Sequence, residues 1–176
     1  MLTVEFRIKE GILLDYLAYL CPVDKTTGRY QVSSTSDLGK LLIAYARVSE
    51  RYVPLLPGDR EKVITLQLPL SNASRSMNDR WLYYEPQDML RLQSVLKATL
   101  NMDLISYYLN GKSRGLQKKE IIEMFIVSRN LINVCPYEAM HKRVYRSEQR
   151  KMAEQFRLLE RKARYFEESI DTTGLL

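Results

Sequence analysis

Apolar and polar residues alternate without a break over residues 2–9, which is the two-residue period of a strand with one buried face. The apolar side chains of this segment are expected to face the core: Leu2, Val4, Phe6 and Ile8. Residues 62–70 alternate in the same way and predict a second strand. Its Pro69 lacks an amide donor and therefore marks the end of the strand or an edge. Residues 81–84 alternate as a third strand would, and residues 29–33 are a weaker candidate for a brief strand.

Most other segments repeat apolar residues every three or four positions, which is typical of helices. Residues 12–20 predict a short buried helix that ends before Pro22. Thr35 or Ser36 is expected to cap a helix whose apolar positions continue to Val48. After Pro86 the chain is expected to be helical, over residues 87–100, over 102–109 with Asn101 as cap and Gly111 as stop, over 116–130, and over a long segment from Pro136 to about Glu168.

These elements predict an α+β fold that is predominantly helical. A small N-terminal unit of two or three strands is followed by a C-terminal helical array that ends in a long helix. The expected division is a small α+β unit over 1–70, a loop or linker with an aromatic segment over 71–86, and a helical region over 87–176. The length of 176 residues suits one domain or a small domain with an appendage.

Composition excludes several classes of protein. With 45% hydrophobic and 27% charged residues and only 7 glycines, the chain fits neither disordered nor fibrous proteins. Its apolar runs are far shorter than the roughly 20 residues that span a bilayer. No signal peptide is readable at the N-terminus, so we expect a cytoplasmic protein without a membrane partner. Cys21 and Cys135 are then expected to be reduced thiols.

The search for catalytic chemistry is mostly negative. His141 is the single histidine and has no cysteine or carboxylate cluster beside it, so no zinc site is predicted. Gly111, Lys112 and Ser113 match the end of a phosphate-binding loop, but Ser106 occupies the place of its first glycine. We therefore expect a non-enzyme with no metal, no cofactor and no small-molecule substrate. An enzyme acting on nucleic acid stays an alternative if carboxylates converge beside the basic residues.

Net charge is the first informative property. The formal charge is +6, and residues 112–151 alone hold ten basic and four acidic side chains. A localised positive region favours a polyanionic partner, most often nucleic acid. The sequence also predicts a helix over residues 116–130, a connector over 131–135 and a helix that starts at Pro136. This order suits a helix-turn-helix-like DNA-binding module, although the connector is long for one.

Nine residues are the candidate nucleic-acid contacts, with duplex DNA favoured over RNA: Lys112, Arg114, Lys118, Lys119, Lys142, Arg143, Arg146, Arg150 and Lys151. Two lysines in this set fall in the first turn of a predicted helix, where the helix dipole disfavours cations and a bound phosphate would reverse the penalty. The later members recur at helical neighbour spacing and form a basic stripe. The alternative interpretation is a solvated helix face. Stacking of unpaired bases on the aromatic segment around Trp81 is a further hypothesis.

The long C-terminal helix carries apolar residues in two interleaved seven-residue repeats. This pattern predicts a seam that pairs with another helix. We expect a homo-oligomer through Tyr145, Met152, Phe156, Leu159, Ala163, Phe166 and Ile170, whereas packing within the chain or against a foreign partner are alternatives. Two functions follow from these patterns. The first is a regulatory or accessory nucleic-acid-binding protein, and the second is a structural or adaptor protein that assembles through the long helix.

Overall fold

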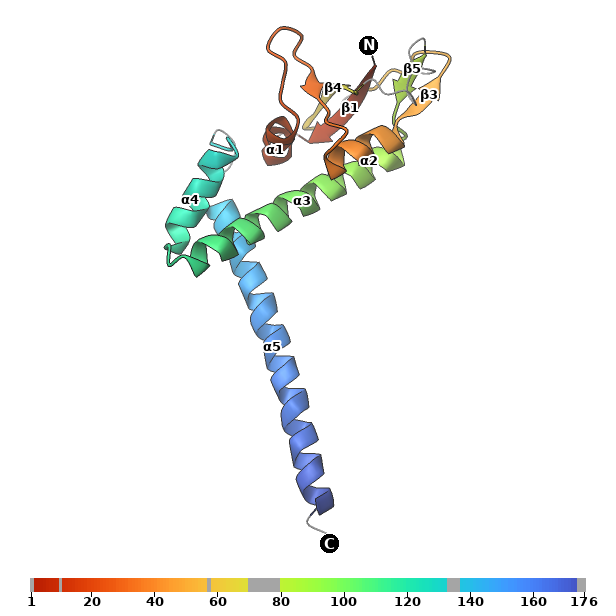
Figure 1. Cartoon of the computed structure of the whole chain (residues 1–176). Coiled ribbons are helices and arrows are strands. Elements are labelled where there is room, and N and C mark those ends of the chain that lie inside the picture. The colour runs from red at the N-terminus through yellow and green to blue at the C-terminus, as the bar shows by residue number, and fades with distance from the viewer. Residues whose placement is uncertain (1, 10, 57, 70–79, 133–136, 174–176) are drawn as a thin grey trace. The chain divides into compact units, whose positions relative to one another are not determined.

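The computed structural model describes residues 2–9, 11–56, 58–69, 80–132 and 137–173. The chain divides into two compact units, Met1–Pro136 and Tyr137–Leu176. Among the described residues, the first unit contains a five-stranded sheet and four helices, and the second contains one long helix (Figure 1). The structure thus confirms a mixed, mostly helical fold that ends in a long helix.

Five strands form one sheet in the order β2-β4-β1-β5-β3. Its centre is an antiparallel pair that runs from Thr3 opposite Gln67 to Lys9 opposite Glu61. The central pair confirms the two strands that the alternation predicts. The strand bounds are β1 (Thr3–Lys9), β2 (Tyr30–Gln31), β3 (Arg47–Ser49), β4 (Glu61–Gln67) and β5 (Trp81–Tyr83).

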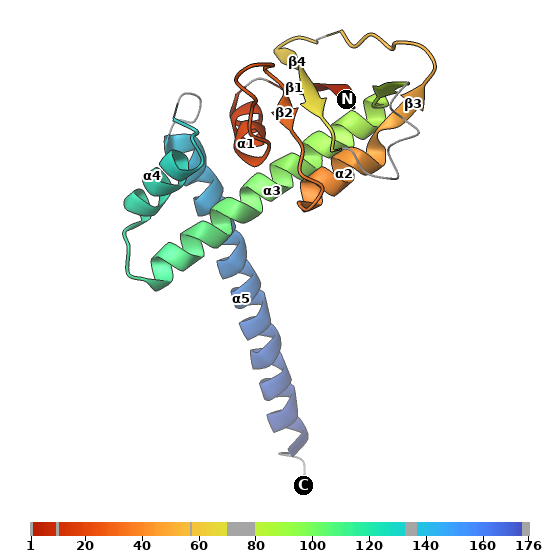
Figure 2. The same cartoon turned by 45° about the horizontal axis from the view of Figure 1, so that its top comes forward.

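One face of the sheet is covered and carries the core. Val4, Phe6 and Ile8 on β1 keep at most 2% of their surface exposed, whereas the residues between them are half-buried. Figure 2 shows α1 (Ile12–Leu20), α2 (Asp37–Tyr45) and the start of α3 (Pro86–Ser113) gathered along the strands. Gln93 of α3 donates a 2.8 Å hydrogen bond to the carbonyl oxygen of Arg7, which ties this helix to β1.

The expected two or three strands are too few, because the sheet has five. One of them, β3, is missing from the prediction altogether. The sequence pattern extends the second helix to Val48, but that helix ends at Tyr45 and Ala46 adopts an extended conformation. Val48 then pairs with Leu82 of β5 in the antiparallel edge of the sheet. A strand of three residues is too short to show an alternating pattern, so only its pairing partner identifies it.

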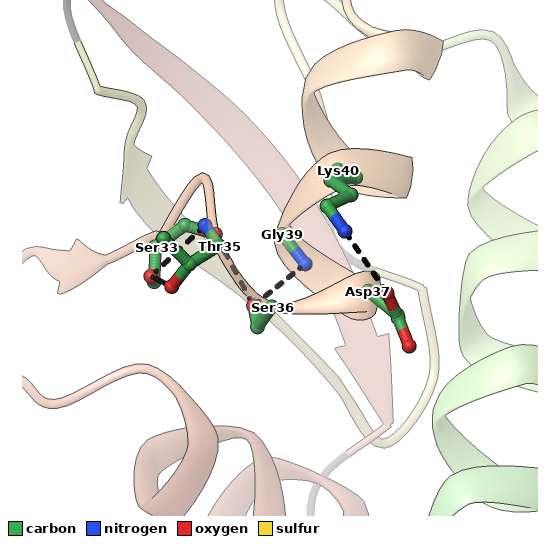
Figure 3. Close-up of polar contacts among 6 residues, drawn as sticks. All are labelled: Ser33, Thr35, Ser36, Asp37, Gly39 and Lys40. Atoms are coloured by element: carbon green, nitrogen blue, oxygen red, sulfur yellow. Dashed lines mark hydrogen bonds and ion pairs between the residues drawn. The ribbon is translucent and has the colours of Figure 1, made fainter.

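The start of α2 is capped as predicted, by Ser36. Its side-chain oxygen accepts a 3.0 Å hydrogen bond from the amide of Gly39 and donates to the carbonyl oxygen of Ser33 (Figure 3). Asp37 in the first turn forms a 3.2 Å ion pair with Lys40. The cap satisfies an amide that the helix itself leaves without a partner, which fixes where the helix begins.

The two helices expected over residues 87–109 are one continuous helix. The prediction that Asn101 caps a new helix and that Gly111 stops it is wrong, because α3 runs from Pro86 to Ser113. Buried apolar side chains recur along its whole length at Met89, Leu92, Leu96, Leu100, Leu104 and Tyr108. This regular spacing keeps one face of the helix in the core past Asn101, and the burial outweighs a local capping preference.

Gly111 lies inside α3 where it meets α4 (Lys118–Ser128). A β-carbon at this glycine would lie 2.7 Å from a side-chain carbon of Ile121. The residue is therefore needed for close packing of the two helices, and it does not end the first one. The last element is α5 (Tyr137–Thr173), which confirms the predicted long helix. The loop predicted over 71–79 lies outside the described residues.

Candidate nucleic-acid interface

Four of the nine predicted contacts surround the connection between α3 and α4. Lys112 is in the last turn of α3, Arg114 caps its end, and Lys118 and Lys119 begin α4. Three of these side chains are exposed and Lys118 is half-buried. Gly115 turns the chain between the helices with a φ of 79°, which glycine adopts without strain.

The ring of Tyr108 brings two of these cations together. The ammonium groups of Lys112 and Lys118 each lie 5.9 Å from its centroid. The tyrosine is buried, so its ring is held in place by the core while the two lysines approach it from different helices. A cation over an aromatic face gains about 0.5–1 kcal/mol at exposed sites. Both ammonium groups therefore contact the same buried ring, one from the end of α3 and one from the start of α4.

The start of α4, where the sequence predicts a phosphate, holds a carboxylate of the chain itself. Gln117 and Glu120 form a reciprocal capping box there, in which the amide of Gln117 donates a 3.0 Å hydrogen bond to the carboxylate of Glu120. The Glu120 amide donates in turn to the Gln117 side chain. A carboxylate of the chain itself therefore already supplies the negative charge that the helix dipole favours. Lys119 also lies 3.9 Å from Glu123.

Arg129 is one of the ten basic residues between positions 112 and 151, but its side chain points into the protein. Its guanidinium forms hydrogen bonds of 2.9 and 3.0 Å with both carboxylate oxygens of Asp103. These hydrogen bonds raise the pKa of Arg129. The same guanidinium lies over the rings of Tyr19, Tyr107 and Phe125. Arg129 therefore connects helices within the first unit and adds nothing to the surface charge.

The other five predicted contacts lie on α5. Successive residues of a helix are about 100° apart around its axis. On this spacing, an arc of about 100° holds four of the five residues: Lys142, Arg143, Arg146 and Arg150. Lys151 lies farther round the helix and does not belong to this face. Among these five side chains Arg143 is half-buried and the others are exposed.

Three arginines that the sequence prediction omitted continue this face: Arg157, Arg161 and Arg164. The signal was present, because Arg143, Arg150, Arg157 and Arg164 recur every seven residues. We use the name basic face of α5 for the set of seven residues Lys142, Arg143, Arg146, Arg150, Arg157, Arg161 and Arg164. With a rise of 1.5 Å per residue, this face extends over about 33 Å.

A second stripe on α5 is apolar and exposed. Tyr145, Met152, Phe156 and Leu159 keep 50%, 67%, 69% and 63% of their surface exposed. Every side chain from Gln149 to Lys162 is exposed in the structure. Ala163, Phe166 and Ile170 continue the predicted seam on helical backbone, but their side chains lie outside the described part of the structure. We name the stripe from Tyr145 to Ala163 the α5 seam.

The nine predicted contacts are thus split between the two units, four in the first and five on α5. The connector of the predicted helix-turn-helix-like module includes residues 133–136, which lie outside the described residues. Within the described chain, no three or more His, Cys, Asp or Glu side chains are placed to hold a metal ion. In the same part of the chain, no helix has both the length and the apolar character needed to cross a membrane.

Trp81, proposed from the sequence as a base-stacking residue, lies on β5, next to the edge strand β3. It keeps 54% of its surface exposed, and its ring meets that of Tyr52 edge to face at 5.2 Å. Tyr84 from the same segment is buried, and its hydroxyl donates a 2.7 Å hydrogen bond to the carbonyl oxygen of Leu42. The aromatic segment is therefore built mainly into the sheet and core, which leaves Trp81 as its exposed member.

Comparisons with known proteins find no match to this chain. No protein-family model matches the chain, no curated protein matches it, and no solved structure matches it.

Proposed function

We propose that the protein is a non-enzymatic nucleic-acid-binding protein that contacts duplex DNA through the basic face of α5. The observation that carries the proposal is the gathering of seven cations on one side of a single helix. Between Tyr137 and Arg164 the helix holds nine basic and four acidic residues. Arginine and lysine at such spacing neutralise successive phosphates and release the counterions that condense on DNA.

The direct test is binding to a random-sequence duplex, measured by fluorescence anisotropy between about 50 and 200 mM salt. If six or more phosphates are contacted, affinity is expected to fall at least about a thousandfold across that range. Changing Arg150, Arg157 and Arg164 to glutamine is expected to reduce the slope of log affinity against log salt by about 3, because each lost contact removes about 0.9. Glutamine favours helices nearly as well as arginine, so α5 stays folded.

A matched control removes three positive charges elsewhere. Lys25, Lys62 and Lys97 are exposed residues of the first unit, and their replacement by glutamine changes the net charge by the same amount. This control is expected to keep the wild-type salt slope. An equal loss of slope in both triple variants would show attraction by overall charge alone and would contradict a defined interface on α5. Absence of binding at 50 mM salt would contradict the proposal outright.

The α5 seam supports a second candidate function, an adaptor or scaffold that assembles through α5. Four large apolar side chains of the seam are exposed to solvent, and they recur every three, four or seven residues, as in helices that pair. Exposed apolar stripes of this length mark interaction surfaces in soluble proteins. The two functions are compatible, because the seam and the basic face occupy different sides of the helix.

Neighbouring leucines provide a test of assembly. Leu159 lies in the α5 seam and Leu158 lies outside it, yet their exposed fractions are similar at 63% and 51%. We expect Leu159→Glu to convert the oligomer to a monomer, because it places a charge in the paired surface. Leu158→Glu is expected to keep the wild-type mass. Size-exclusion chromatography with light scattering measures both, and a monomeric wild type or equal behaviour of the two variants would contradict the proposal.

A further inference from the structure

Charged residues flank the α5 seam in an order that matches its own reverse. In heptad terms the seam has Gln149, Phe156 and Ala163 at positions a, and Tyr145, Met152 and Leu159 at positions d. On one side of it, positions e hold Arg146, Ala153 and Glu160. On the other side, positions g hold Glu148, Gln155 and Lys162. Each flank therefore has opposite charges at its two ends and a neutral residue between them.

Two copies of such a helix complement each other when they run in opposite directions. In an antiparallel pair, positions e face positions e of the second copy and positions g face positions g. When the seam is centred at residue 154, Glu160 is the nearest residue across the e flank from Arg146, and Lys162 is the nearest across the g flank from Glu148, each offset by two residues along the axis. Twofold symmetry repeats both contacts, so four opposite-charge pairs form and no like charges meet. Arg146 and Glu160 are both exposed on α5 and available for these contacts.

A parallel pair uses the same residues poorly. Positions e would then face positions g of the second copy, which places Arg146 beside His141 and Glu160 beside Gln155. The opposite-charge contact that remains within the heptads joins Lys162 to Glu167. The charge order therefore favours the antiparallel direction, in which each flank of the seam forms two opposite-charge pairs.

The sizes of the seam residues favour the same direction. Centred at residue 154, the antiparallel pair sets Tyr145 opposite position 163, where the sequence has alanine, and sets Met152 opposite Phe156. A large residue then meets a small one, and a flexible methionine meets an aromatic ring. A parallel pair would place every residue against its own copy, so that Tyr145 meets Tyr145 and alanine meets alanine. That arrangement combines crowded layers with an empty one, which packs less well.

We infer that the α5 seam binds a second copy of this chain in the antiparallel direction, with Arg146 of each copy paired with Glu160 of the other. The inference rests on the assembly candidate described above and names the partner and the geometry. The paired stretch from Tyr145 to Ala163 extends over about 27 Å of each helix. The arginines that recur at Arg143, Arg150, Arg157 and Arg164 occupy positions b, outside the paired surface. The dimer therefore leaves most of the basic face of each copy open to solvent.

Charge reversal at the two paired positions tests the inference. In the homodimers of Arg146→Glu two glutamates meet at both symmetric contacts, and in those of Glu160→Arg two arginines meet. We expect the dimer dissociation constant of each variant to rise about tenfold or more, because repulsion replaces attraction at two places. Mixing the two full-length variants is expected to restore wild-type affinity in a heterodimer. The carboxylate introduced by Arg146→Glu then faces the guanidinium introduced by Glu160→Arg, and the native Arg146 faces the native Glu160. Sedimentation equilibrium measures the affinity, and native mass spectrometry identifies the heterodimer by mass.

Matched controls carry the same charge changes off the seam. Arg150→Glu lies at position b and Glu154→Arg at position f, and both side chains are exposed. We expect neither control to weaken the dimer and their mixture to show no preference for heterodimers. A wild-type dimer whose reversed variants show no gain on mixing would overturn the antiparallel pairing and leave the assembly candidate standing. A wild type that stays monomeric in the light-scattering experiment would overturn both.

Discussion

Replacing Asp103 with alanine is expected to lower the free energy of unfolding by about 3 kcal/mol. This carboxylate is the centre of a polar cluster that joins three helices of the first unit. It accepts two hydrogen bonds from the Arg129 guanidinium and one of 3.1 Å from the Tyr16 hydroxyl. Tyr16 lies on α1, Asp103 on α3, and Arg129 caps the end of α4. Loss of the carboxylate therefore weakens the connection between all three helices.

The size of the effect follows from what the substitution leaves behind. Side chains of Arg129 and Asp103 keep only 18% and 25% of their surface exposed. Without Asp103 the guanidinium stays among three aromatic rings with a charge that water reaches poorly. Breaking a buried pair in this way costs about 3–5 kcal/mol, and partial exposure places this pair at the lower end. Urea unfolding followed by circular dichroism measures the change.

Glu123→Ala is the matched control for this prediction. It also removes a helix carboxylate with a basic partner, but its pair with Lys119 is 3.9 Å long and both side chains are more than half exposed. Exposed pairs contribute about 0–1 kcal/mol, so little change in stability is expected. Equal losses of stability for Asp103→Ala and Glu123→Ala would contradict a structural role of the cluster.

The second large effect expected is loss of stability in alkali. Burial raises the pKa of the Cys21 thiol from 9.0 to about 11. Burial also raises the pKa of Tyr16 and Tyr84 above the ordinary value of 10.0, with a further contribution from the nearby Asp103 carboxylate at Tyr16. Deprotonated Tyr84 would in addition lose its donation to the carbonyl oxygen of Leu42. All three groups are therefore held neutral in the folded protein.

The sign of the pH dependence follows from these directions. Above pH 9 the unfolded chain releases the Cys21 proton, and above pH 10 it releases the tyrosine protons. The folded protein keeps both tyrosine protons over this range and keeps the Cys21 proton until the pH approaches 11. The folded state then binds more protons, so the free energy of unfolding falls as the pH rises. Each group contributes up to about 1.4 kcal/mol per pH unit. Between pH 10 and 11 the three together are expected to remove on the order of 3 kcal/mol, because the unfolded tyrosines are only half deprotonated at pH 10 and Cys21 begins to release its own proton near pH 11.

Tyr16→Phe separates this cause from general alkaline effects. The variant lacks one of the three titrating groups, so the fall in stability between pH 10 and 11 is expected to be smaller by about a third. Unfolding in urea at a series of pH values measures the slope for wild type and variant. A stability that stays constant from pH 8 to 11, or an identical slope in the variant, would contradict the prediction.

Local pattern was sufficient wherever one element alone decides the outcome. The alternation in residues 2–9 predicts β1, a cap at Thr35 or Ser36 predicts where α2 begins, and the seven-residue repeats predict α5. In each case the period of the apolar residues, or one side-chain hydrogen bond, is stronger than its local competitors. The basic stripe on α5 was predicted for the same reason, because helical spacing alone places its residues on one face.

Features that depend on distant residues required the structure. The three residues of β3 form a strand because β5 pairs with them, and α3 continues through Asn101 because its buried face continues. From the sequence, Arg129 cannot be distinguished from the exposed basic residues around it. In the structure its guanidinium points into the protein, where it pairs with Asp103, 26 residues earlier in the chain. The Glu120 carboxylate likewise accepts a hydrogen bond from the Gln117 amide at the start of α4, where the sequence predicted a bound phosphate.

The sequence by itself therefore determined the strand period of β1 and β4 and the helical period of α5, and with the latter the seam and the basic stripe of α5. Only the tertiary structure decided which strands share a sheet, where α3 ends and which charged side chains form ion pairs inside the protein. The physical reason is that periodicity and capping act over a few residues of one segment. Strand pairing, close helix packing and buried ion pairs depend on groups far apart in the chain, and their burial outweighs local preference.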